Sequence, residues 1–430
     1  MKIAVAGYGV EGKANLEYFR GKGEVTIVDE RDIIYDVPGD VPTITGAGAF
    51  SRLTDFDLVV RTAGLAPDKI ITNGKIWSAT NEFFEKCPAK IIGVTGTKGK
   101  GTTSSFIASI LHSAGYRVHL VGNIGTPALD VLPSIRPDDI VVYELSSFQL
   151  WDLKRSPHIA VVLMVEPDHL DVHVDMDEYV RAKKNIRRFQ TPLDVCWFHP
   201  DNKISREIAE SGSSGRAAPF NTPGVSGSVY IQGNAFCVND QEICPTNTVL
   251  LPGAHNLENA AAAMSAVLTI APDAKTHISA SLRSFTGLPH RLKFVRDVQG
   301  VRYYDDSIST TPGSALAAIR SFDQPKVMLL GGRSKGSSYE EVIDECQRTG
   351  TKIVAFGESG PEIARLAKSR GIIHTLVKSG RSMSSIVKEA HNIADAGDVV
   401  ILSPAGSSFD MYENYQQRGD AYVAAINNEL

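Results

Sequence analysis

A glycine-rich loop near residue 96 has the composition of a phosphate-binding site. The stretch GVTGTKGKGTT follows an apolar, strand-like run and precedes a helical segment. Glycines let backbone N–H groups converge on phosphate oxygens, the helix N-terminus adds positive potential, and Lys100 can reach the β- and γ-phosphates. We therefore expect an ATP site, the alternative being a glycine turn with an incidental lysine. The expected contacts are Gly96, Thr97, Gly99, Lys100, Gly101, Thr102 and Thr103.

A second glycine loop opens the chain. MKIAVAGYGVEG places Gly7, Gly9 and Gly12 in the G-x-G-x-x-G spacing after an apolar run, and Asp29 ends the next such run. An acidic residue there would bind ribose hydroxyls in a dinucleotide enzyme. A glycine loop and a helix N-terminus suit any diphosphate, however. The loop therefore leaves open a nicotinamide site and a site for another nucleotide.

Three further segments carry candidate functional residues. Glu144 follows the apolar run DIVVY, and its hard oxygen suits Mg²⁺, although a surface carboxylate at a strand end is the alternative. His169 and His173 lie among aspartates in EPDHLDVHVD, a spacing that also permits a zinc site. Lys183 and Lys184 are adjacent on a helical segment, and from the residues alone they could form a solvated basic face. A hydroxyl of Thr102 or Thr103 could also bind Mg²⁺.

The composition limits which classes of protein can position these groups. Of 430 residues, 43% are hydrophobic and 22% are charged, so large buried cores are expected. A net charge of −5 argues against broad nucleic-acid binding. The 5 cysteines are scattered and form no C-x-x-C pair, which favours free thiols in a reducing compartment. We see no secretory segment and no membrane-spanning run, and expect a cytoplasmic protein.

Strand-like and helical segments alternate along the chain. KIAVAG, EVTIVDE and DLVVRTAG predict strands of a first parallel sheet, and IIGVTG, DIVVYELS and IAVVLMV those of a second. Residues 210–228 are rich in Ser, Gly and Pro and predict a mobile loop, followed by a hairpin at VYIQGNAFCV. From residue 301 the alternation returns, in VRYYDDS, KVMLLGG, KIVAFG and DVVILSPAG. The pattern predicts three α/β domains.

Eight short motifs in order resemble the Mur ligase superfamily, which includes folylpolyglutamate synthases. The resemblance covers nearly the whole chain. The motifs are GTKGKGTT, YELSSFQL at 143–150, EPDHLDVH at 166–173, YVRAK at 179–183, GAHNLENAAAA at 253–263, PHR at 289–291, DDS at 305–307 and LSPAGSSFDMYENYQQRG at 402–419.

The resemblance implies an ATP-dependent acid–amino-acid ligase of peptidoglycan synthesis that works through an acyl phosphate. GNIG at 122–125, the last motif and the length favour the branch that adds D-glutamate to UDP-N-acetylmuramoyl-L-alanine. The implied fold is α/β with three domains. They are a Rossmann-like UDP-sugar-binding domain at 1–88, a central P-loop ATPase domain with a mostly parallel sheet at 89–287 and a Rossmann-like glutamate-binding domain at 288–430.

The family also implies roles for individual residues. The catalytic set is Lys100, His169 and Lys183, and two Mg²⁺ ions are expected on Thr102, Glu144, His169 and an N-carbamylated Lys183. ATP is also expected to contact Asn259 through adenine, Arg291 through phosphate and Asp306 through ribose. The UDP-sugar set is Val10, Glu11, Asp29, Arg31, Asn123 and Gln149, although Arg31 could be a solvated charge. The glutamate set is Thr310, Lys335, Ser408, Phe409 and Tyr415.

The chain departs from the family pattern at four places. Ile308 in DSIST stands where a lysine is common, TAGLAP at 62–67 replaces S-P-G-I, Pro167 replaces an acid, and Gly101 is inserted after Lys100. The alternatives are a folylpolyglutamate synthase-like ligase, a variant that adds L-glutamate, a catalytically silent nucleotide-binding scaffold and an NAD oxidoreductase. We expect a monomer that binds neither nucleic acid nor membrane.

Overall fold

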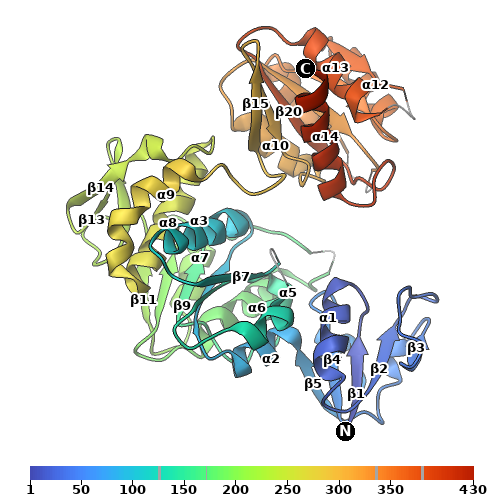
Figure 1. The fold of residues 1–430 in the computed structure, drawn as a ribbon, viewed down its shortest axis with the longest axis vertical. Helices are drawn as coiled ribbons and strands as arrows, with labels where there is room; N and C mark the ends of the chain where they lie inside the picture. Colours follow the sequence, from blue (N-terminus) through green and yellow to red (C-terminus); the bar gives the residue numbers. More distant parts are fainter. Residues whose placement is uncertain (124–126, 171, 335–337, 379–381) are drawn as a thin grey trace. The chain divides into compact units, whose positions relative to one another are not determined.

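The computed structural model describes residues 1–430 apart from 124–126, 171, 335–337 and 379–381. The chain divides into two compact units, which Figure 1 shows from blue at the N-terminus to red at the C-terminus. The first unit is Met1–Val249 with Leu257–Ser284, and the second is Leu250–Asn256 with Phe285–Leu430. Helices flank mostly parallel sheets in both units, so the predicted α/β class is confirmed.

An N-terminal sheet of five parallel strands begins the first unit. Its order is β3-β2-β1-β4-β5, so the order reverses direction between β1 and β4. Its inner strands are apolar runs, as expected where both sheet faces are covered. The elements are β1 Lys2–Ala6, α1 Val10–Phe19, β2 Glu24–Asp29, β3 Thr43–Thr45, β4 Leu58–Arg61, β5 Lys75–Ser78 and α2 Ala79–Lys86, with 3₁₀ turns at Ala49–Ser51 and Pro67–Lys69.

A central sheet of six parallel strands follows, in the order β11-β10-β9-β6-β8-β7. Its strands are β6 Lys90–Thr95, β7 Val118–Gly122, β8 Ile140–Glu144, β9 Ile159–Val162, β10 Val195–Phe198 and β11 Arg216–Pro219. The described helices around it are α3 Lys100–Ser113, α4 Ala128–Val131, α5 Ser147–Leu150, α6 Met176–Arg188, α7 Lys203–Ala209, α8 Ala254–Ile270 and α9 Ile278–Ser284, with 3₁₀ turns at Leu132–Ser134, Thr246–Thr248 and Pro272–His277.

The segment 210–228 was expected to be a mobile loop, and this expectation is wrong for its middle. Residues Arg216–Pro219 form β11, which pairs in parallel with β10 at the sheet edge. Pairing with β10, and not its own propensity, makes this Ala- and Pro-containing stretch a strand, and an edge tolerates the proline. The expected hairpin is confirmed: β12 Val229–Gln232 and β13 Ala235–Val238 are antiparallel, and β14 Gln241–Pro245 completes that small sheet.

The second unit contains a six-stranded sheet in the order β15-β16-β20-β17-β18-β19. β15 is antiparallel to its neighbour and the other pairs are parallel. The strands are β15 Lys293–Val298, β16 Val301–Asp305, β17 Lys326–Gly331, β18 Lys352–Phe356, β19 His374–Leu376 and β20 Val399–Ala405. The helices are α10 Pro312–Arg320, α11 Glu340–Arg348, α12 Gly360–Ser369, α13 Met383–Ile393 and α14 Tyr415–Glu429. No helix in the described part of the chain is long and apolar enough to cross a bilayer.

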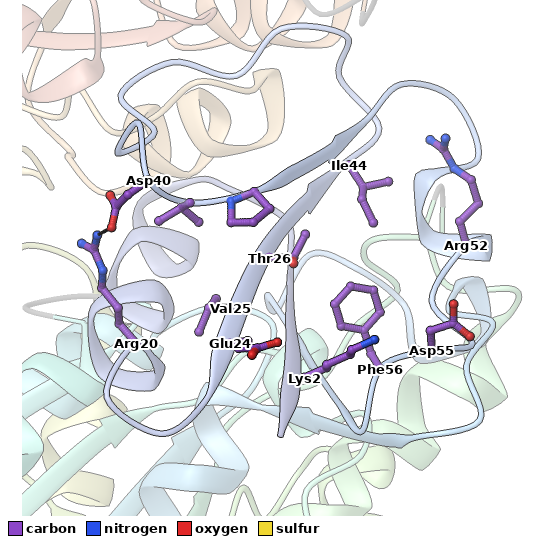
Figure 2. Close-up of a pocket in the computed structure, with 12 residues that line it drawn as sticks. Lys2, Arg20, Glu24, Val25, Thr26, Asp40, Ile44, Arg52, Asp55 and Phe56 are labelled. Carbon is purple, nitrogen blue, oxygen red and sulfur yellow. Dashed lines mark hydrogen bonds and ion pairs between the residues drawn. The ribbon is translucent and has the colours of Figure 1, made fainter.

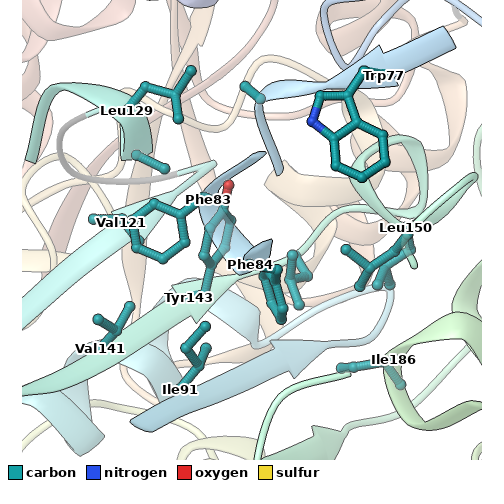
Figure 3. Close-up of a cluster of buried hydrophobic side chains, with 14 of the residues drawn as sticks. Trp77, Phe83, Phe84, Ile91, Val121, Leu129, Val141, Tyr143, Leu150 and Ile186 are labelled. Carbon is teal, nitrogen blue, oxygen red and sulfur yellow. The ribbon is translucent and has the colours of Figure 1, made fainter. Parts of the chain in front are cut away.

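One hydrophobic core runs through the N-terminal and central sheets of the first unit. Figure 3 shows Phe83 and Phe84 of α2 against Tyr143 of β8, with ring centroids 5.4 and 5.5 Å apart. Aromatic pairs at these distances add to the stabilisation that burial provides. The N-terminal and central sheets are therefore fixed to each other by apolar packing.

A pocket of about 560 Å³ lies on the N-terminal sheet, lined by both charges and apolar groups (Figure 2). Lys2 begins β1, and Glu24 to Thr26 begin β2, so the pocket is at the amino ends of these strands. Arg20 and Asp40 form an ion pair across its wall. The glycine loop follows the carboxyl end of β1, so this pocket is not the predicted nucleotide site.

Candidate active site

The carboxyl ends of three strands of the central sheet bring the predicted phosphate loop next to segments that carry predicted metal ligands. β6 has β8 and β9 as its neighbours, and all three are parallel. The glycine loop 96–99 follows β6, Glu144 ends β8, and the 163–169 segment follows β9. Because the carboxyl ends of parallel strands meet at one edge, these three segments adjoin each other, at the place where open α/β sheets bind ligands.

The glycines of this loop are required by its geometry. Gly96 has φ +151° and Gly99 has φ +84°, conformations that L side chains rarely adopt. A Cβ on Gly99 would lie 2.5 Å from the Asn259 side-chain oxygen, and Thr103 Oγ1 donates to the same oxygen at 3.3 Å. Asn259 on α8 therefore packs directly on the loop and on the first turns of α3.

Two lysine amines converge on one carbonyl of the loop. Lys100 Nζ donates to Gly96 O at 3.1 Å and to Thr97 O at 2.9 Å. Lys183 Nζ, on α6, donates to the same Gly96 O at 3.1 Å and to Thr95 Oγ1 at 3.2 Å. Burial lowers the pKa of Lys183 well below its ordinary value, the charge of Lys100 lowers it further, and Asp168 opposes the shift.

Glu144 has an unused oxygen at the same sheet edge. The residue is buried, with 3% exposure, and its Oε1 accepts a hydrogen bond from Asn123 Nδ2 at 3.2 Å. Its Oε2 is buried without a hydrogen-bond partner among the described residues. Because an unpartnered buried carboxylate oxygen is costly, this one is suited to a cation. Thr102 is also buried, in the first turn of α3.

The two histidines of the 166–175 segment differ in environment. The His169 side chain is 47% exposed and its backbone has φ +55°. His173 is buried, stacks on Phe148 with centroids 5.4 Å apart, and shares a hydrogen bond with Ser147 Oγ at 2.9 Å. Burial lowers the pKa of His173. Within the described residues no group of three His, Cys, Asp or Glu side chains could hold a metal ion.

The N-terminal glycine loop is tightly built. A Cβ on Gly12 would lie 2.2 Å from Gly7 O, and one on Gly7 would lie 2.2 Å from Thr62 Oγ1. Val10 is 76% exposed at the start of α1, and Glu11 Oε2 accepts a hydrogen bond from Ala63 N at 2.7 Å. Burial raises the pKa of Glu11. The loop thus packs against the turn that follows β4.

Asp29 and Arg31 form a closed pair beside this loop. Arg31 donates to Asp29 through Nε at 2.9 Å and Nη2 at 2.8 Å, and Tyr8 N donates to Asp29 Oδ2 at 2.9 Å. The Arg31 side chain lowers the pKa of Asp29 to about 2. The carboxylate therefore anchors the loop backbone as well as the guanidinium.

Asn123 and Gln149, both expected on the UDP-sugar, are engaged locally. Asn123 Nδ2 donates to Glu144, and the Gln149 side chain accepts from Ser146 N at 2.9 Å to complete the N-terminal cap of α5. Capping boxes of this kind fix the start of a helix. Both side chains thus hold the segment that carries Glu144.

The second unit contains Arg291 and Asp306, the other expected ATP contacts. Asp306 is buried, and Ser309 Oγ at 2.5 Å and Ser403 Oγ at 2.7 Å donate to its Oδ2. Burial raises its pKa to about 6. Its neighbour Asp305 binds His290 Nδ1 at 2.7 Å, which holds the pKa of that imidazole above its ordinary value. Arg291 is partly exposed.

The described residues of the expected glutamate set follow two neighbouring strands of the C-terminal sheet. Thr310 follows β16, and Ser408 and Phe409 follow β20, which lies between β16 and β17. Ser408 is 2% exposed and Phe409 is 62% exposed, while Tyr415 begins α14. Lys335 lies outside the described residues.

Sequence reasoning missed residues that hold these loops. Arg61 and Arg418 are fully buried arginines, and Asp152 is the carboxylate partner of the first. Arg418 donates to Ser307 O at 2.8 Å and to Gly406 O at 3.1 Å, so it joins the segments after β16 and β20. The available signal was an arginine ending the apolar run LVV, since a charge at that position is rarely buried without a partner.

Comparison with known proteins identifies relatives along most of the chain. The family description "Mur ligase middle domain" matches residues 94–267, and "Mur ligase, glutamate ligase domain" matches residues 290–406. The UDP-N-acetylmuramoylalanine--D-glutamate ligase of Clostridium perfringens is 35% identical over 395 residues, covering 89% of this chain and 85% of its own. The ligase of the same name from Clostridium kluyveri is 33% identical over 446 residues, covering 99% and 96%.

Solved structures share the fold at low sequence identity. The UDP-N-acetylmuramate-alanine ligase of Thermotoga maritima has a TM-score of 0.63 at 16% identity and covers 100% of both chains. A MurF ligase from the same organism, solved in complex with ADP, has a TM-score of 0.58 at 16% identity and covers 100% of this chain and 94% of its own.

Proposed function

The chain belongs to the Mur ligase family, and from this premise we propose that it adds D-glutamate to UDP-N-acetylmuramoyl-L-alanine with the consumption of ATP. The observation that carries the proposal is the edge of the central sheet. There the amines of Lys100 and Lys183 meet at Gly96 O, at the sheet edge that also presents the unused oxygen of Glu144.

The proposed reaction has two steps. An oxygen of the L-alanine carboxylate attacks the γ-phosphorus of ATP, and ADP leaves with the electrons of the broken P–O bond. The amine of glutamate then attacks the acyl phosphate, loses a proton, and phosphate leaves. Both steps need positioning and charge neutralisation more than a protein nucleophile. The loop amides and Lys100 provide these at the triphosphate.

Two oxygen donors at the central edge, on Glu144 and Thr102, are of the kind that Mg²⁺ prefers. Glu144 Oε2 is buried and free of hydrogen bonds from described residues, and Thr102 and His169 flank the same edge. We assign two ions to Thr102, Glu144, His169 and Lys183. When bound, Mg²⁺ neutralises phosphoryl charge and orients the oxygens. Glu144 is itself oriented by Asn123.

Lys183 can contribute to this set only after modification. A protonated amine would repel a metal ion, whereas a carbamate supplies anionic oxygens. Carbamylation joins the unprotonated amine to CO₂ with release of one proton. The buried position of Lys183 beside Lys100 favours the unprotonated amine that this reaction requires.

The remaining assignments complete a three-domain ligase. The proposed boundaries, 1–88, 89–287 and 288–430, each enclose one parallel or mostly parallel sheet. UDP-sugar is assigned to Val10, Glu11, Asp29, Arg31, Asn123 and Gln149. The adenine, phosphate and ribose of ATP are assigned to Asn259, Arg291 and Asp306. Glutamate is assigned to Thr310, Lys335, Ser408, Phe409 and Tyr415.

Phosphate release from ATP tests the proposal directly. The purified chain is incubated with UDP-N-acetylmuramoyl-L-alanine and each of D-glutamate, L-glutamate, D-aspartate and L-alanine. We expect release with D-glutamate that depends on both substrates, and a product heavier than the acceptor by one glutamyl residue. Incorporation of L-glutamate alone would reverse the stereochemical assignment. Activity with a pteroate acceptor and none with the UDP-sugar would instead support a folylpolyglutamate synthase-like ligase. Light scattering tests the proposed monomer.

A further inference from the structure

Arg61 is a fully buried cation at the carboxyl end of β4. Its side chain is 0% exposed, and its guanidinium forms a two-pronged contact with Asp152, from Nε at 3.1 Å and from Nη2 at 2.5 Å. Burying a charge is costly unless it is paired and fully hydrogen-bonded. The burial of this guanidinium therefore depends on the partners that its other N–H groups find.

The same guanidinium holds the turn that follows β4. Its Nη1 donates to the carbonyls of Thr62, Ala63 and Leu65, at 3.4, 3.3 and 3.2 Å. Because each carbonyl is rigidly part of a peptide plane, three such bonds fix the backbone of the turn. We call residues 62–65 the β4 turn.

The β4 turn forms one wall of the place where the N-terminal sheet should bind its ligand. The strand order reverses between β1 and β4, and open α/β sheets bind ligands at that reversal, beyond the carboxyl ends of the strands. Thr62 occupies the space that a side chain on Gly7 would need, and Ala63 N donates to Glu11 Oε2 at 2.7 Å. The N-terminal glycine loop is the other wall.

The opposite side of Arg61 reaches the segment that carries Glu144. Nη2 donates to Phe148 O at 3.1 Å, and Phe148 lies in α5, the next helix after β8. Asp152 follows two residues after α5. One side chain thus contacts both the β4 turn and α5, the helix that begins three residues after Glu144.

We propose that Arg61 is a positioning residue that fixes the β4 turn as the second wall of the UDP-sugar site and holds it in register with the Glu144 segment. The proposal rests on the function proposed above. The acceptor carboxylate must reach the metal edge while its nucleotide stays in the N-terminal crevice. A small displacement between the two would separate reacting groups that need contact distances.

The test compares two variants that remove contacts between the same two regions. Arg61→Lys keeps the charge but loses the planar fork, which lysine cannot reproduce. The control is Asn81→Ala, in α2. Asn81 Nδ2 donates to Asp152 O at 3.1 Å and Asn81 Oδ1 accepts from Lys154 N at 2.8 Å, and neither bond involves the β4 turn. Binding of UDP-N-acetylmuramoyl-L-alanine is measured by calorimetry, and KM is measured for all three substrates.

We expect Arg61→Lys to weaken UDP-sugar binding about 10-fold or more, as loss of charge-assisted hydrogen bonds implies, and to leave the KM for ATP within about twofold. Asn81→Ala should lower the melting temperature and leave UDP-sugar binding unchanged. Asp152→Asn, which keeps the shape of the partner, should act in the same direction as Arg61→Lys and decides the question if the lysine variant does not fold.

Equal UDP-sugar binding by the native and Arg61→Lys proteins would overturn the proposal, as would equal loss in Asn81→Ala. The native protein separates this failure from a failure of the proposed function. If the native chain itself does not bind the UDP-sugar, the proposed function is wrong. If it binds and the variants bind equally well, only the role of Arg61 is wrong.

Discussion

The two glycine loops of the first unit share a backbone plan but differ in the charges around them. Each follows the carboxyl end of a parallel strand and leads into a helix, α1 in one case and α3 in the other. The stretch Gly7–Gly12 contains no lysine, and the nearby Asp29 and Arg31 neutralise each other. At the central loop, by contrast, the Lys100 amine adds a positive charge beside the Gly96 carbonyl.

This difference is what the proposed function requires of two loops that share one local fold. A diphosphate that is only held needs backbone donors and a helix N-terminus. A triphosphate that reacts needs positive charge where negative charge moves in the transition state. On this proposal, the glycine spacing indicates where a phosphate binds. The surrounding charges indicate whether that phosphate is only bound or is also transferred.

The largest expected effect comes from removing charge at the central loop. Lys100→Ala should lower kcat by roughly 10²-fold or more while circular dichroism stays native, because an electrostatic contact to the phosphates is lost. The control is Lys98→Ala in the same loop, since the Lys98 side chain is 71% exposed and lies 3.6 Å from Glu166. Phosphate release is the measurement. Near-normal turnover in Lys100→Ala would show that the positive charge at the central loop does not account for the reaction there.

A comparable loss should follow at α6. Lys183→Ala should be inactive, and a short carboxylate such as acetate should restore part of the activity by supplying the missing oxygens. Lys184→Ala is the matched control, because that amine is bound to Glu207 at 2.8 Å instead of facing the loop. Full activity of Lys183→Ala, with no response to acetate or bicarbonate, would contradict carbamylation.

The N-terminal loop should respond to shape instead of charge. Gly12→Ala places a Cβ 2.2 Å from Gly7 O, and overpacking of this kind costs about 1–3 kcal/mol, so the melting temperature should fall. Gly9→Ala has φ −94° and nothing within 4 Å of its new Cβ, so stability should be unchanged. The added methyl of Gly9→Ala instead enters the open side of the loop and should raise the KM for UDP-sugar. Equal melting temperatures for the two variants would show that the loop is not tightly packed.

The sequence predicted the inner strands and the loops that follow them. Runs such as KIAVAG and DIVVYELS are apolar because both sheet faces are covered, and glycine spacing marks the turns after two of them. The edge strand Arg216–Pro219 was not predicted, because it is a strand through its pairing with β10 and its own residues have no strand pattern. Short edge strands carry little local signal.

Site residues that act through contacts between distant segments could not be predicted. Arg61 and Asp152 are 91 residues apart, and no local pattern joins them. Arg418 and Ser307 are 111 residues apart in the same way, although each lies in a motif that the sequence displays. The sequence indicates which residue types are gathered at a sheet edge, whereas the structure is needed to show which partner each one takes.

The smallest expected effect concerns the neutralised pair at the N-terminal loop. The Arg31 side chain lowers the pKa of Asp29 from 3.8 to about 2, so the ionised carboxylate is stabilised in the folded protein. This stabilisation is present above about pH 4 and is lost as the pH falls towards 2, because folding then no longer favours the ionised form. Since Arg31 is half-exposed, we expect about 1–2 kcal/mol. Asp29→Asn should therefore destabilise the protein more at pH 6 than at pH 3.

Urea unfolding followed by tryptophan fluorescence measures this difference in the first unit, which contains Trp77, Trp151 and Trp197. The control is Asp68→Asn, which changes an exposed carboxylate in the 3₁₀ turn between β4 and β5. Its effect on the free energy of unfolding should be the same at pH 6 and pH 3. The difference in the free energy of unfolding between the native protein and Asp29→Asn could instead stay constant from pH 6 to pH 3. That result would mean that Asp29 holds Tyr8 N through a hydrogen bond that does not depend on the carboxylate charge. The N-terminal loop would then depend on charge even less than the comparison with the central loop implies.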